Sequence, residues 1–187
     1  YTSSSSSNAG YACVGAGIPG SHVDRTVGIV KAYSTCVGEG PFTAEWFGEE
    51  AEQLRVAGAE YGAATGRPRR VGPIDLVATR YGCRIQGATE VALTKLDVLS
   101  YMKEIPVCTQ YEVNGEKTDD FPFTAVIDEA KPVLTTVPGW GCDISGVRKY
   151  EDLPQAARDY VEYVEKAIGV HISYVSVGAG RDEIIYR

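Results

Sequence analysis

Residues 154–177 read PQAARDYVEYVEKAIGVHISYVSV and predict a helix that leads directly into a strand. Pro154 suits the first turn of a helix, and Gly169 suits the position just after its end. Between them, apolar residues recur every three or four positions and form one helix face: Ala157, Tyr160, Val161, Val164 and Ile168. The run from His171 to Val177 then predicts a buried strand.

Helices and strands alternate along the rest of the chain. One helix is predicted over 43–57, capped by Thr43 and ended by Gly58, and another opens at Pro73. The second helix has one apolar face: Ile74, Val77, Ala78 and Tyr81. Strands are predicted at 91–93 and at 105–113, where the chain enters a hairpin turn at Asn114-Gly115. After a polar stretch at 3–10, which is predicted to be a loop or disordered, this order favours a mixed α/β domain.

The composition is that of a globular protein, with 44% hydrophobic and 23% charged residues among 187. Acidic residues outnumber basic ones by 25 to 18, so the net charge of -7 disfavours binding to nucleic acid or to an anionic membrane. No apolar run approaches the ~20 residues that cross a bilayer, which predicts a soluble chain. Five cysteines without a CxxC pair predict reduced thiols in a cytosolic protein: Cys13, Cys36, Cys83, Cys108 and Cys142.

Gly15-Ala16-Gly17-Ile18-Pro19-Gly20 matches the GxGxxG pattern of dinucleotide-binding loops. Glu39 follows at about the distance expected of a ribose-binding carboxylate. That pattern requires a buried strand just before the glycines, whereas the preceding residues are rich in serine and Pro19 falls within the turn. A structural glycine loop is therefore favoured, and an NAD-dependent oxidoreductase domain is an alternative that rests on this motif alone.

Thr94-Lys95-Leu96-Asp97 follows the strand at 91–93 and resembles the TKxD element with which GTP-binding proteins read guanine. An aspartate carboxylate accepts hydrogen bonds from both the ring N–H and the exocyclic amine of guanine, a donor pair that adenine lacks. Ser176-Val177-Gly178 ends another strand and offers backbone N–H groups to the guanine carbonyl. Ligands of open α/β sheets collect at such strand ends, so the two elements support one another. A solvated Lys–Asp surface pair is the alternative interpretation.

Gly66-Arg67-Pro68-Arg69-Arg70 concentrates three of the 18 basic residues within four positions of an acidic chain. Guanidinium groups bind carboxylates and phosphates in a bidentate manner, so this loop is a candidate anion site, with a solvated basic turn as the alternative. The sequence contains no GxxxxGK loop followed by Ser or Thr, the pattern that cradles nucleotide phosphates. The rest of such a site is therefore expected upstream of Tyr1, where the sequence opens without a methionine.

A series of segments closely resembles the C-terminal part of the adenylosuccinate synthetase family. In chain order they are Val37–Phe42, Ala64–Arg70, Leu93–Leu99, Pro138–Trp140, Asp143–Val147, Leu153-Pro154, Ala156-Ala157, Tyr160–Tyr163 and Ser176–Gly178. The resemblance spans residues 1–187 as a single region that lacks the N-terminal phosphate-loop and catalytic part. It implies a P-loop-NTPase-like α/β fold with a mixed, mostly parallel sheet and flanking helices.

The same resemblance implies a ligase that forms a C–N bond between L-aspartate and IMP, giving adenylosuccinate in AMP biosynthesis. The reaction is coupled to GTP cleavage with Mg2+, and the enzyme is a cytoplasmic homodimer that binds neither nucleic acid nor membrane. The implied aspartate-binding loop is Ala63, Ala64, Thr65, Gly66, Arg67, Pro68 and Arg69. The implied IMP contacts are Thr2 and Arg67. The implied GTP site is Arg69, Lys95, Leu96, Asp97, Ser176, Val177 and Gly178.

The resemblance implies no catalytic residue and no metal ligand within this chain, so the Mg2+ ligands are expected in the N-terminal part. The isolated chain is accordingly expected to be inactive, with His171 in a structural role at the start of a strand and His22 in a loop. Ala64 departs from the family by removing one hydroxyl from the aspartate loop, and Cys36 stands in place of a usual arginine. The stretch 178–181 and the longer serine run at 3–7 also depart, and the latter bears on Thr2. A stand-alone, non-catalytic purine-nucleotide-binding module is the alternative function.

Overall fold

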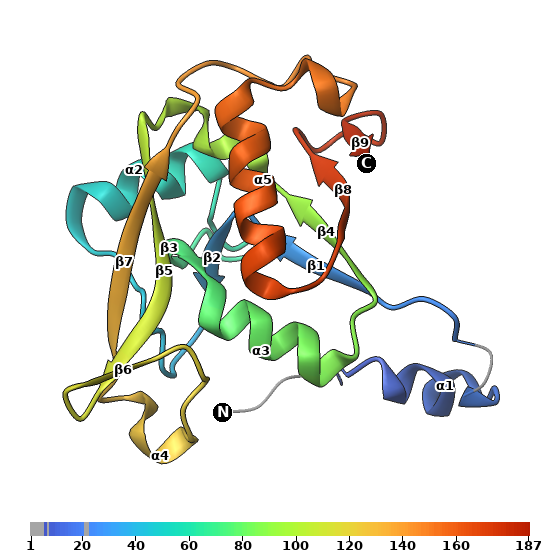
Figure 1. The fold of residues 1–187 in the computed structure, drawn as a ribbon, viewed down its shortest axis with the longest axis vertical. Coiled ribbons are helices and arrows are strands. Elements are labelled where there is room, and N and C mark those ends of the chain that lie inside the picture. The colour runs from blue at the N-terminus through green and yellow to red at the C-terminus, as the bar shows by residue number, and fades with distance from the viewer. Residues whose placement is uncertain (1–5, 7, 21–22) are drawn as a thin grey trace.

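Two β-sheets lie side by side in the computed structural model, which describes residues 6, 8–20 and 23–187 (Figure 1). The first has the order β1-β4-β8-β9 and comprises β1 (Val27–Lys31), β4 (Glu90–Thr94), β8 (Ile172–Ser176) and β9 (Ile184–Tyr186). β1, β4 and β8 are parallel, and β9 returns antiparallel to β8. The carboxyl ends of the three parallel strands therefore meet at one edge of the sheet.

The second sheet has the order β2-β3-β5-β6, with β7 also paired to β5. Its strands are β2 (Tyr33–Cys36), β3 (Arg70–Asp75), β5 (Glu104–Val113), β6 (Glu116–Thr118) and β7 (Lys131–Pro138). β3 and β5 are parallel, and the other pairings are antiparallel. Only Ala32 separates β1 from β2, and its N–H donates to the carbonyl of Thr94 at 2.8 Å. One nearly continuous segment therefore links the two sheets.

Helices pack around these sheets: α1 (Gly10–Ala16), α2 (Gly48–Gly58), α3 (Leu76–Gln86), α4 (Thr124–Ile127), α5 (Gln155–Ile168) and the 3-10 helices η2 (Leu96–Tyr101) and η3 (Tyr150–Asp152). α5 crosses the front of the sheets in Figure 1 and packs against α3. α2 packs against β3 and η2, whereas α1 stands to the side of both sheets. None of the helices in the described part of the chain is long and apolar enough to cross a membrane.

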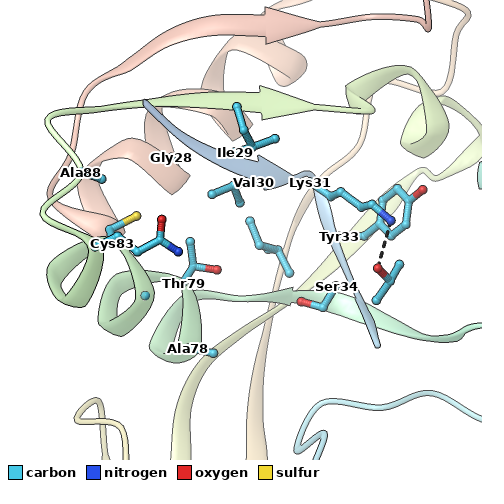
Figure 2. Close-up of a pocket in the computed structure, with 14 residues that line it drawn as sticks. Gly28, Ile29, Val30, Lys31, Tyr33, Ser34, Ala78, Thr79, Cys83 and Ala88 are labelled. Atoms are coloured by element: carbon cyan, nitrogen blue, oxygen red, sulfur yellow. Dashed lines mark hydrogen bonds between the residues drawn. The ribbon is translucent and has the colours of Figure 1, made fainter. Parts of the chain in front are cut away.

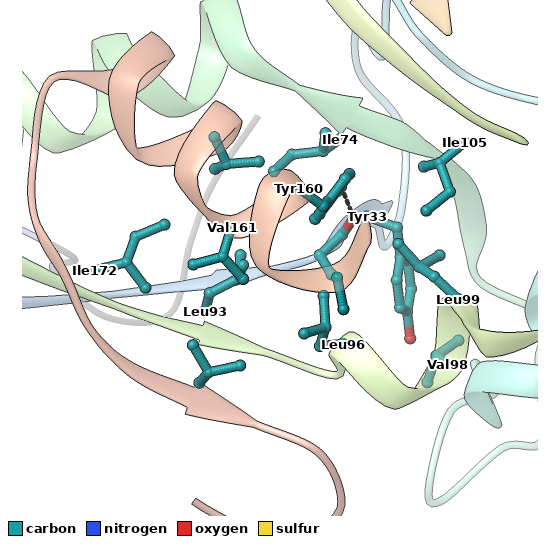
Figure 3. Close-up of a cluster of buried hydrophobic side chains, with 14 of the residues drawn as sticks. Tyr33, Ile74, Leu93, Leu96, Val98, Leu99, Ile105, Tyr160, Val161 and Ile172 are labelled. Carbon is teal, nitrogen blue, oxygen red and sulfur yellow. Dashed lines mark hydrogen bonds between the residues drawn. The ribbon is translucent and has the colours of Figure 1, made fainter. Parts of the chain in front are cut away.

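The main hydrophobic core joins both sheets to α5 (Figure 3). Ile74 of β3, Leu93 of β4 and Ile105 of β5 are all at most 2% exposed. Tyr160 of α5 belongs to the same cluster, and its hydroxyl donates to the carbonyl of Ala32 at 2.6 Å. Full burial of such side chains contributes roughly 1.5–3 kcal/mol each, so the core fixes α5 across the link between the two sheets.

The expected mixed α/β architecture is confirmed, and so are its clearest elements. α5 lies between Pro154 and Gly169, and its predicted apolar face is buried. β4, β5 and β8 coincide with predicted strands. The turn at Asn114-Gly115 has φ angles of 54° and 83°, which suit a two-residue hairpin.

The predicted start of the helix at 43–57 is wrong, because α2 begins at Gly48, although its end at Gly58 is confirmed. Trp46, just before α2, donates its N–H to the carbonyl of Val71 in β3 at 2.8 Å. That backbone is therefore bonded to the sheet, so Thr43 caps no helix.

The predicted helix start at Pro73 is also wrong, since Pro73 pairs with Tyr33 inside the sheet. α3 begins at Leu76. The carboxylate of Asp75 accepts from the N–H of Ala78 at 3.0 Å and caps the first turn. A capping carboxylate thus sets this helix start, three residues after the proline that the sequence favoured.

The glycine motif at 15–20 lies in and after a helix. Gly15 belongs to α1, and Gly17 ends that helix with a φ of 66°. A dinucleotide loop needs a strand before its glycines, whereas Tyr11 to Val14 are helical. The structure thus contradicts the NAD-binding alternative. Of the polar loop predicted at 3–10, only residues 6 and 8–10 are described, and Gly10 already opens α1.

Candidate functional site

The carboxyl ends of β4 and β8 bring the two segments predicted to read a base to one edge of the sheet. The strands are neighbours, and their register pairs Leu93 with Val175. Lys95-Leu96-Asp97 follows the first strand directly, and Ser176-Val177-Gly178 begins at the last residue of the second. Segments about 80 residues apart in the sequence therefore emerge side by side, as parallel strands require.

Lys95 stands between β4 and η2 in a left-handed conformation, with a φ of 60°. Its ammonium donates to the carbonyl of Gly58 at 2.6 Å and to Oε1 of Glu60 at 3.0 Å. Leu96 beside it is fully buried in the core. The burial of Leu96 and the hydrogen bonds of Lys95 therefore fix this turn, and the turn in turn fixes the backbone of Asp97.

Asp97 is half-buried, and its Oδ1 atom is buried without a hydrogen-bond partner among the described residues. Burial raises the pKa of Asp97, its own backbone N–H and the charge of Lys95 oppose this, and the negative charges of Glu183 and Asp143 add to it. A buried acceptor without a donor is uncommon and costs free energy. Oδ1 is therefore a candidate acceptor for the donor groups of a ligand.

The turn after β8 is closed by its own contacts. The hydroxyl of Ser176 donates to the carbonyl of Gly178 at 2.8 Å, and the N–H of the buried Val177 donates to that of Glu183 at 2.9 Å. The Glu183 carboxylate accepts from the N–H of Gly180 and lies so close to Gly178 that a Cβ atom there would overlap it. A side chain at 178 would therefore displace the Glu183 carboxylate.

Residues 63–69 form a loop whose base is closed by backbone hydrogen bonds. The N–H of Arg69 donates to the carbonyl of Glu60 at 2.9 Å, and the N–H of Gly62 donates to that of Arg67 at 2.8 Å. Gly66 has a φ of 64° and turns the chain at the tip. Every residue from 63 to 68 is exposed, so the loop presents its groups outward on a fixed base.

The three arginines of this segment have different surroundings. Arg67 is exposed, and its guanidinium makes no hydrogen bond within the part of the chain that the structure describes. Arg69 donates from Nη1 to Oε2 of Glu60 at 2.6 Å, whereas its Nε is buried without a partner among those same residues. Arg70 donates to Glu45 at 2.9 Å and to the carbonyl of Gly40 at 2.8 Å, so it stabilises the segment between β2 and α2.

Glu60 joins the two predicted parts of the site, and sequence analysis missed it. Its side chain is fully buried. Besides Arg69 and Lys95, it accepts from Nζ of Lys31 at 2.9 Å and from the hydroxyl of Tyr33 at 2.5 Å. Burial alone would raise the pKa of Glu60, but these four donors outweigh it and lower the pKa to about 2. The carboxylate is therefore ionised at neutral pH.

The partners of Glu60 respond to the same surroundings. Burial raises the pKa of Tyr33, and the negative charge of Glu60 adds to this effect. Burial lowers the pKa of Lys31, an effect that the charges of Lys95 and Arg69 reinforce and that Glu60 opposes. In the sequence, nothing distinguishes Glu60 from the other acidic residues near this helix. The helix ends at Gly58, so the helical pattern of apolar residues does not indicate whether Glu60 is buried.

A cleft of about 370 Å³ lies between β1, β2 and α3 (Figure 2). Its described lining includes Ile29 and Cys83, and it adjoins the Glu60 cluster through Lys31 and Tyr33. Lys31 lies at the Tyr33 end of this cleft and donates to the hydroxyl of Thr35 at 2.9 Å. The described lining contains none of the predicted aspartate-loop or GTP residues, so the candidate site lies at the strand ends instead.

Thr2 and His22 lie outside the described residues. His171 begins the segment before β8, and its Nδ1 lies 2.9 Å from Oε2 of Glu165 in α5, a contact between neighbouring elements. All five cysteines are free. Among residues 6, 8–20 and 23–187, no three His, Cys, Asp or Glu side chains gather as a metal-binding group.

Comparison with known proteins gives one consistent family. The profile of the family described as "Adenylosuccinate synthetase" matches residues 1–185. An adenylosuccinate synthetase from Bifidobacterium adolescentis is 50% identical over 186 residues, which are 99% of this chain and 44% of that protein. The chloroplastic adenylosuccinate synthetase of Zea mays is 47% identical over 189 residues, which are 100% of this chain and 39% of that protein.

Among solved structures, a fully ligated adenylosuccinate synthetase from Plasmodium falciparum matches with a TM-score of 0.94 and 35% sequence identity. The match covers 100% of this chain and 45% of that one. The chain therefore spans less than half the length of each of these relatives.

Proposed function

The chain belongs to the adenylosuccinate synthetase family, and from this premise we propose that its protein ligates L-aspartate to IMP with cleavage of GTP. The product is adenylosuccinate, a precursor in AMP biosynthesis. Residues 1–187 are proposed to form a single region of that enzyme, which supplies the guanine pocket and the aspartate-binding loop. Catalytic groups for proton and phosphoryl transfer are assigned to the remainder of the enzyme.

Asp97 is the residue that we assign to reading the guanine base. Its buried Oδ1 has no partner among the described residues, and guanine offers its ring N–H and exocyclic amine as donors to one carboxylate. A hydrogen bond to a charged group contributes about 1.5–3 kcal/mol, enough to favour guanine over adenine by roughly tenfold to a hundredfold. This acceptor, placed at the carboxyl end of a parallel strand, is the observation that carries the proposal.

The remaining GTP contacts are proposed around Asp97. Lys95 and Leu96 hold the turn that presents its carboxylate, and Arg69 contacts the nucleotide with a guanidinium whose Nε has no partner among the described residues. Ser176, Val177 and Gly178 offer the neighbouring turn to the base. The adjacency of β4 and β8 supports a single pocket made from both turns.

The exposed loop is proposed to bind L-aspartate through Ala63, Ala64, Thr65, Gly66, Arg67, Pro68 and Arg69. The substrate carries two carboxylates, and guanidinium groups bind these with paired hydrogen bonds. Arg67 has its guanidinium exposed and unbonded within the described chain, which supports a contact with aspartate and also with IMP. Thr2 is proposed as a second IMP contact. Ala64 offers no hydroxyl, so the loop binds aspartate with one donor fewer.

We propose that the complete enzyme uses Mg2+, is located in the cytoplasm and forms a homodimer. We also propose that it binds neither nucleic acid nor a membrane. Mg2+ neutralises charge on transferring phosphates, and we assign its ligands, as the family resemblance implies, to the part of the enzyme outside this chain. The free cysteines support a reducing compartment.

The proposal is tested by comparing the complete protein that carries this sequence with residues 1–187 alone. The complete protein should form adenylosuccinate from IMP, L-aspartate, GTP and Mg2+, and ATP should not replace GTP. The shorter chain should show no turnover. Turnover by residues 1–187, or equal rates with ATP and GTP, would contradict the assignment.

The intact mass of the endogenous polypeptide distinguishes the alternative, a stand-alone purine-nucleotide-binding module. A mass well above the 20.1 kDa of this chain favours a complete synthetase. A mass near 20.1 kDa, together with binding of GDP but no turnover, favours the module or assembly with a separate catalytic chain.

A further inference from the structure

We propose that Glu60 is a positioning residue for the GTP site, because its carboxylate holds Arg69 with one oxygen and Lys95 with the other. This role rests on the proposed function and adds to it a residue that contacts neither the base nor the phosphates. Glu60 lies just beyond α2, outside the loop at 63–69 and outside both base-reading turns.

Both carboxylate oxygens of Glu60 accept hydrogen bonds. Oε2 accepts from Arg69 at 2.6 Å, and Oε1 accepts from Lys95 at 3.0 Å, Lys31 at 2.9 Å and Tyr33 at 2.5 Å. These four donors come from three strands or their ends and from the loop base, and they are brought together at one buried point. The separation between Arg69 and Lys95 is therefore set by the width of one carboxylate.

Charge makes this arrangement dependent on Glu60. Three cationic groups surround a side chain with no exposed surface, and two of them, Arg69 and Lys95, are about a third exposed. Without the negative charge, the cations would repel one another at short range in a poorly solvated site. Arg69 and Lys95 would turn toward solvent, whereas Lys31 is 27% exposed and only slightly more shielded.

The contacts of Glu60 also fix the backbone of the two segments that are proposed to bind GTP. Lys95 is fixed in a left-handed turn by its contacts with Glu60 and Gly58, and that turn carries Asp97. The base of the arginine loop is fixed by the same residue, through the Arg69 N–H to the Glu60 carbonyl at 2.9 Å. Glu60 thus sets the base-reading carboxylate and the Arg69 guanidinium at one mutual distance, a condition for both to bind one GTP.

The test uses the complete protein with Glu60→Gln, which keeps the shape of the side chain and removes its charge. Glu52→Gln is the matched control, because Glu52 also accepts from an arginine, Arg55 at 2.9 Å, and a tyrosine, Tyr61 at 3.0 Å, but lies on an exposed helix face. KM for GTP, KM for IMP and kcat are measured, together with GDP binding by calorimetry and the thermal midpoint.

Glu60→Gln is expected to raise KM for GTP and the Kd for GDP by about tenfold or more, while KM for IMP stays within about twofold. Glu52→Gln is expected to leave all of these constants unchanged. Unchanged GTP and GDP constants in folded Glu60→Gln would overturn the proposal. So would an equal rise of both KM values, since that indicates a general structural role.

If Glu60→Gln does not fold, Tyr33→Phe decides the question, because it removes one donor to Glu60 and leaves every charge in place. A rise of about twofold to fivefold in KM for GTP alone supports the role, and an unchanged value overturns it. A wild-type protein that binds no GDP overturns the proposed function and this role with it. If the wild type and Glu60→Gln bind GDP equally well, only the role of Glu60 is overturned.

Discussion

The ammonium of Lys95 lies 3.0 Å from Oε1 of Glu60, although 35 positions separate the two residues in the sequence. Lys95 combines this contact with a φ of 60°, a conformation that costs a residue with a Cβ atom roughly 1–2 kcal/mol. One side chain therefore both closes the polar cluster and holds an unfavourable backbone turn in place.

Replacing Lys95 separates these two effects. Lys95→Ala loses the contacts to Glu60 and Gly58 but keeps the backbone cost, whereas Lys95→Gly loses the contacts and relieves that cost. Both variants are expected to unfold at lower urea concentration than the wild type, with glycine less destabilising than alanine by about 1 kcal/mol. An alanine variant as stable as the glycine variant would show that the turn relaxes once the side chain is removed.

Glu60 makes stability depend on pH in the acidic range. Its pKa is lowered to about 2 in the folded protein, so the folded state favours the ionised form more than the unfolded state does. This stabilisation is complete above the unfolded pKa and is lost as pH falls from about 5 to 2, by about 3 kcal/mol in total. Urea unfolding across that range should show a shallower pH dependence in Glu60→Gln. Parallel curves would contradict the pairing.

Asp97→Asn in the complete enzyme should weaken GTP and improve use of the xanthine nucleotide XTP. Asparagine offers an amide N–H to the extra carbonyl of xanthine, but it loses the charged acceptor for the guanine amine. We expect kcat/KM for GTP to fall by about tenfold to a hundredfold. Steady-state kinetics with both nucleotides measure the switch, and unchanged GTP kinetics would remove Asp97 from the base contact.

The same carboxylate predicts an acidic limit on GTP binding. Burial raises the pKa of Asp97, so its side chain takes up a proton at a higher pH than an ordinary aspartate does. Since the protonated form accepts fewer hydrogen bonds from guanine, KM for GTP should rise as pH falls toward this pKa. KM for IMP serves as the internal reference. The rise should disappear in Asp97→Asn, and its persistence there would assign it to another group.

Gly178→Ala should damage the base-binding turn with little effect elsewhere. The added Cβ would overlap the Glu183 carboxylate, which is itself held by the N–H of Gly180. Displacement of that carboxylate loosens the turn, so KM for GTP should rise by about threefold to tenfold. Gly146→Ala is the control, because a Cβ there meets nothing within 4 Å. Equal kinetics of the two variants would contradict the tight packing at 178.

Segments with a regular apolar pattern, or with proline, glycine or asparagine at their ends, could be predicted from the sequence. α5 has five apolar residues at helical spacing between Pro154 and Gly169, and the hairpin at Asn114-Gly115 has residues that accept positive φ. β7 (Lys131–Pro138) was missed because most of its residues are exposed, so burial imposes no apolar pattern on them. Its pairing with β5 comes from tertiary structure, which a local pattern does not contain.

The candidate site divides in the same way. Asp97, Lys95 and the turn at 176–178 stand beside recognisable strands, so their placement at strand ends could be predicted. Glu60 could not, because its importance arises when β1, β2, the turn after β4 and the loop base before β3 bring four donors to one point. The different surroundings of Arg67, Arg69 and Arg70 also depend on contacts with residues far along the chain, which adjacent positions do not encode.

The position of β1 at the edge of its sheet has a consequence for residues 1–187 when they are separated from the rest of the protein. Within the described chain, β1 pairs with β4 along one side only, and Ile29 on it is 71% exposed. An edge strand of this kind presents unpaired N–H and C=O groups. An apolar side chain beside them favours the addition of a further strand. The same backbone that delivers Lys31 to Glu60 therefore makes solubility depend on what shields that edge.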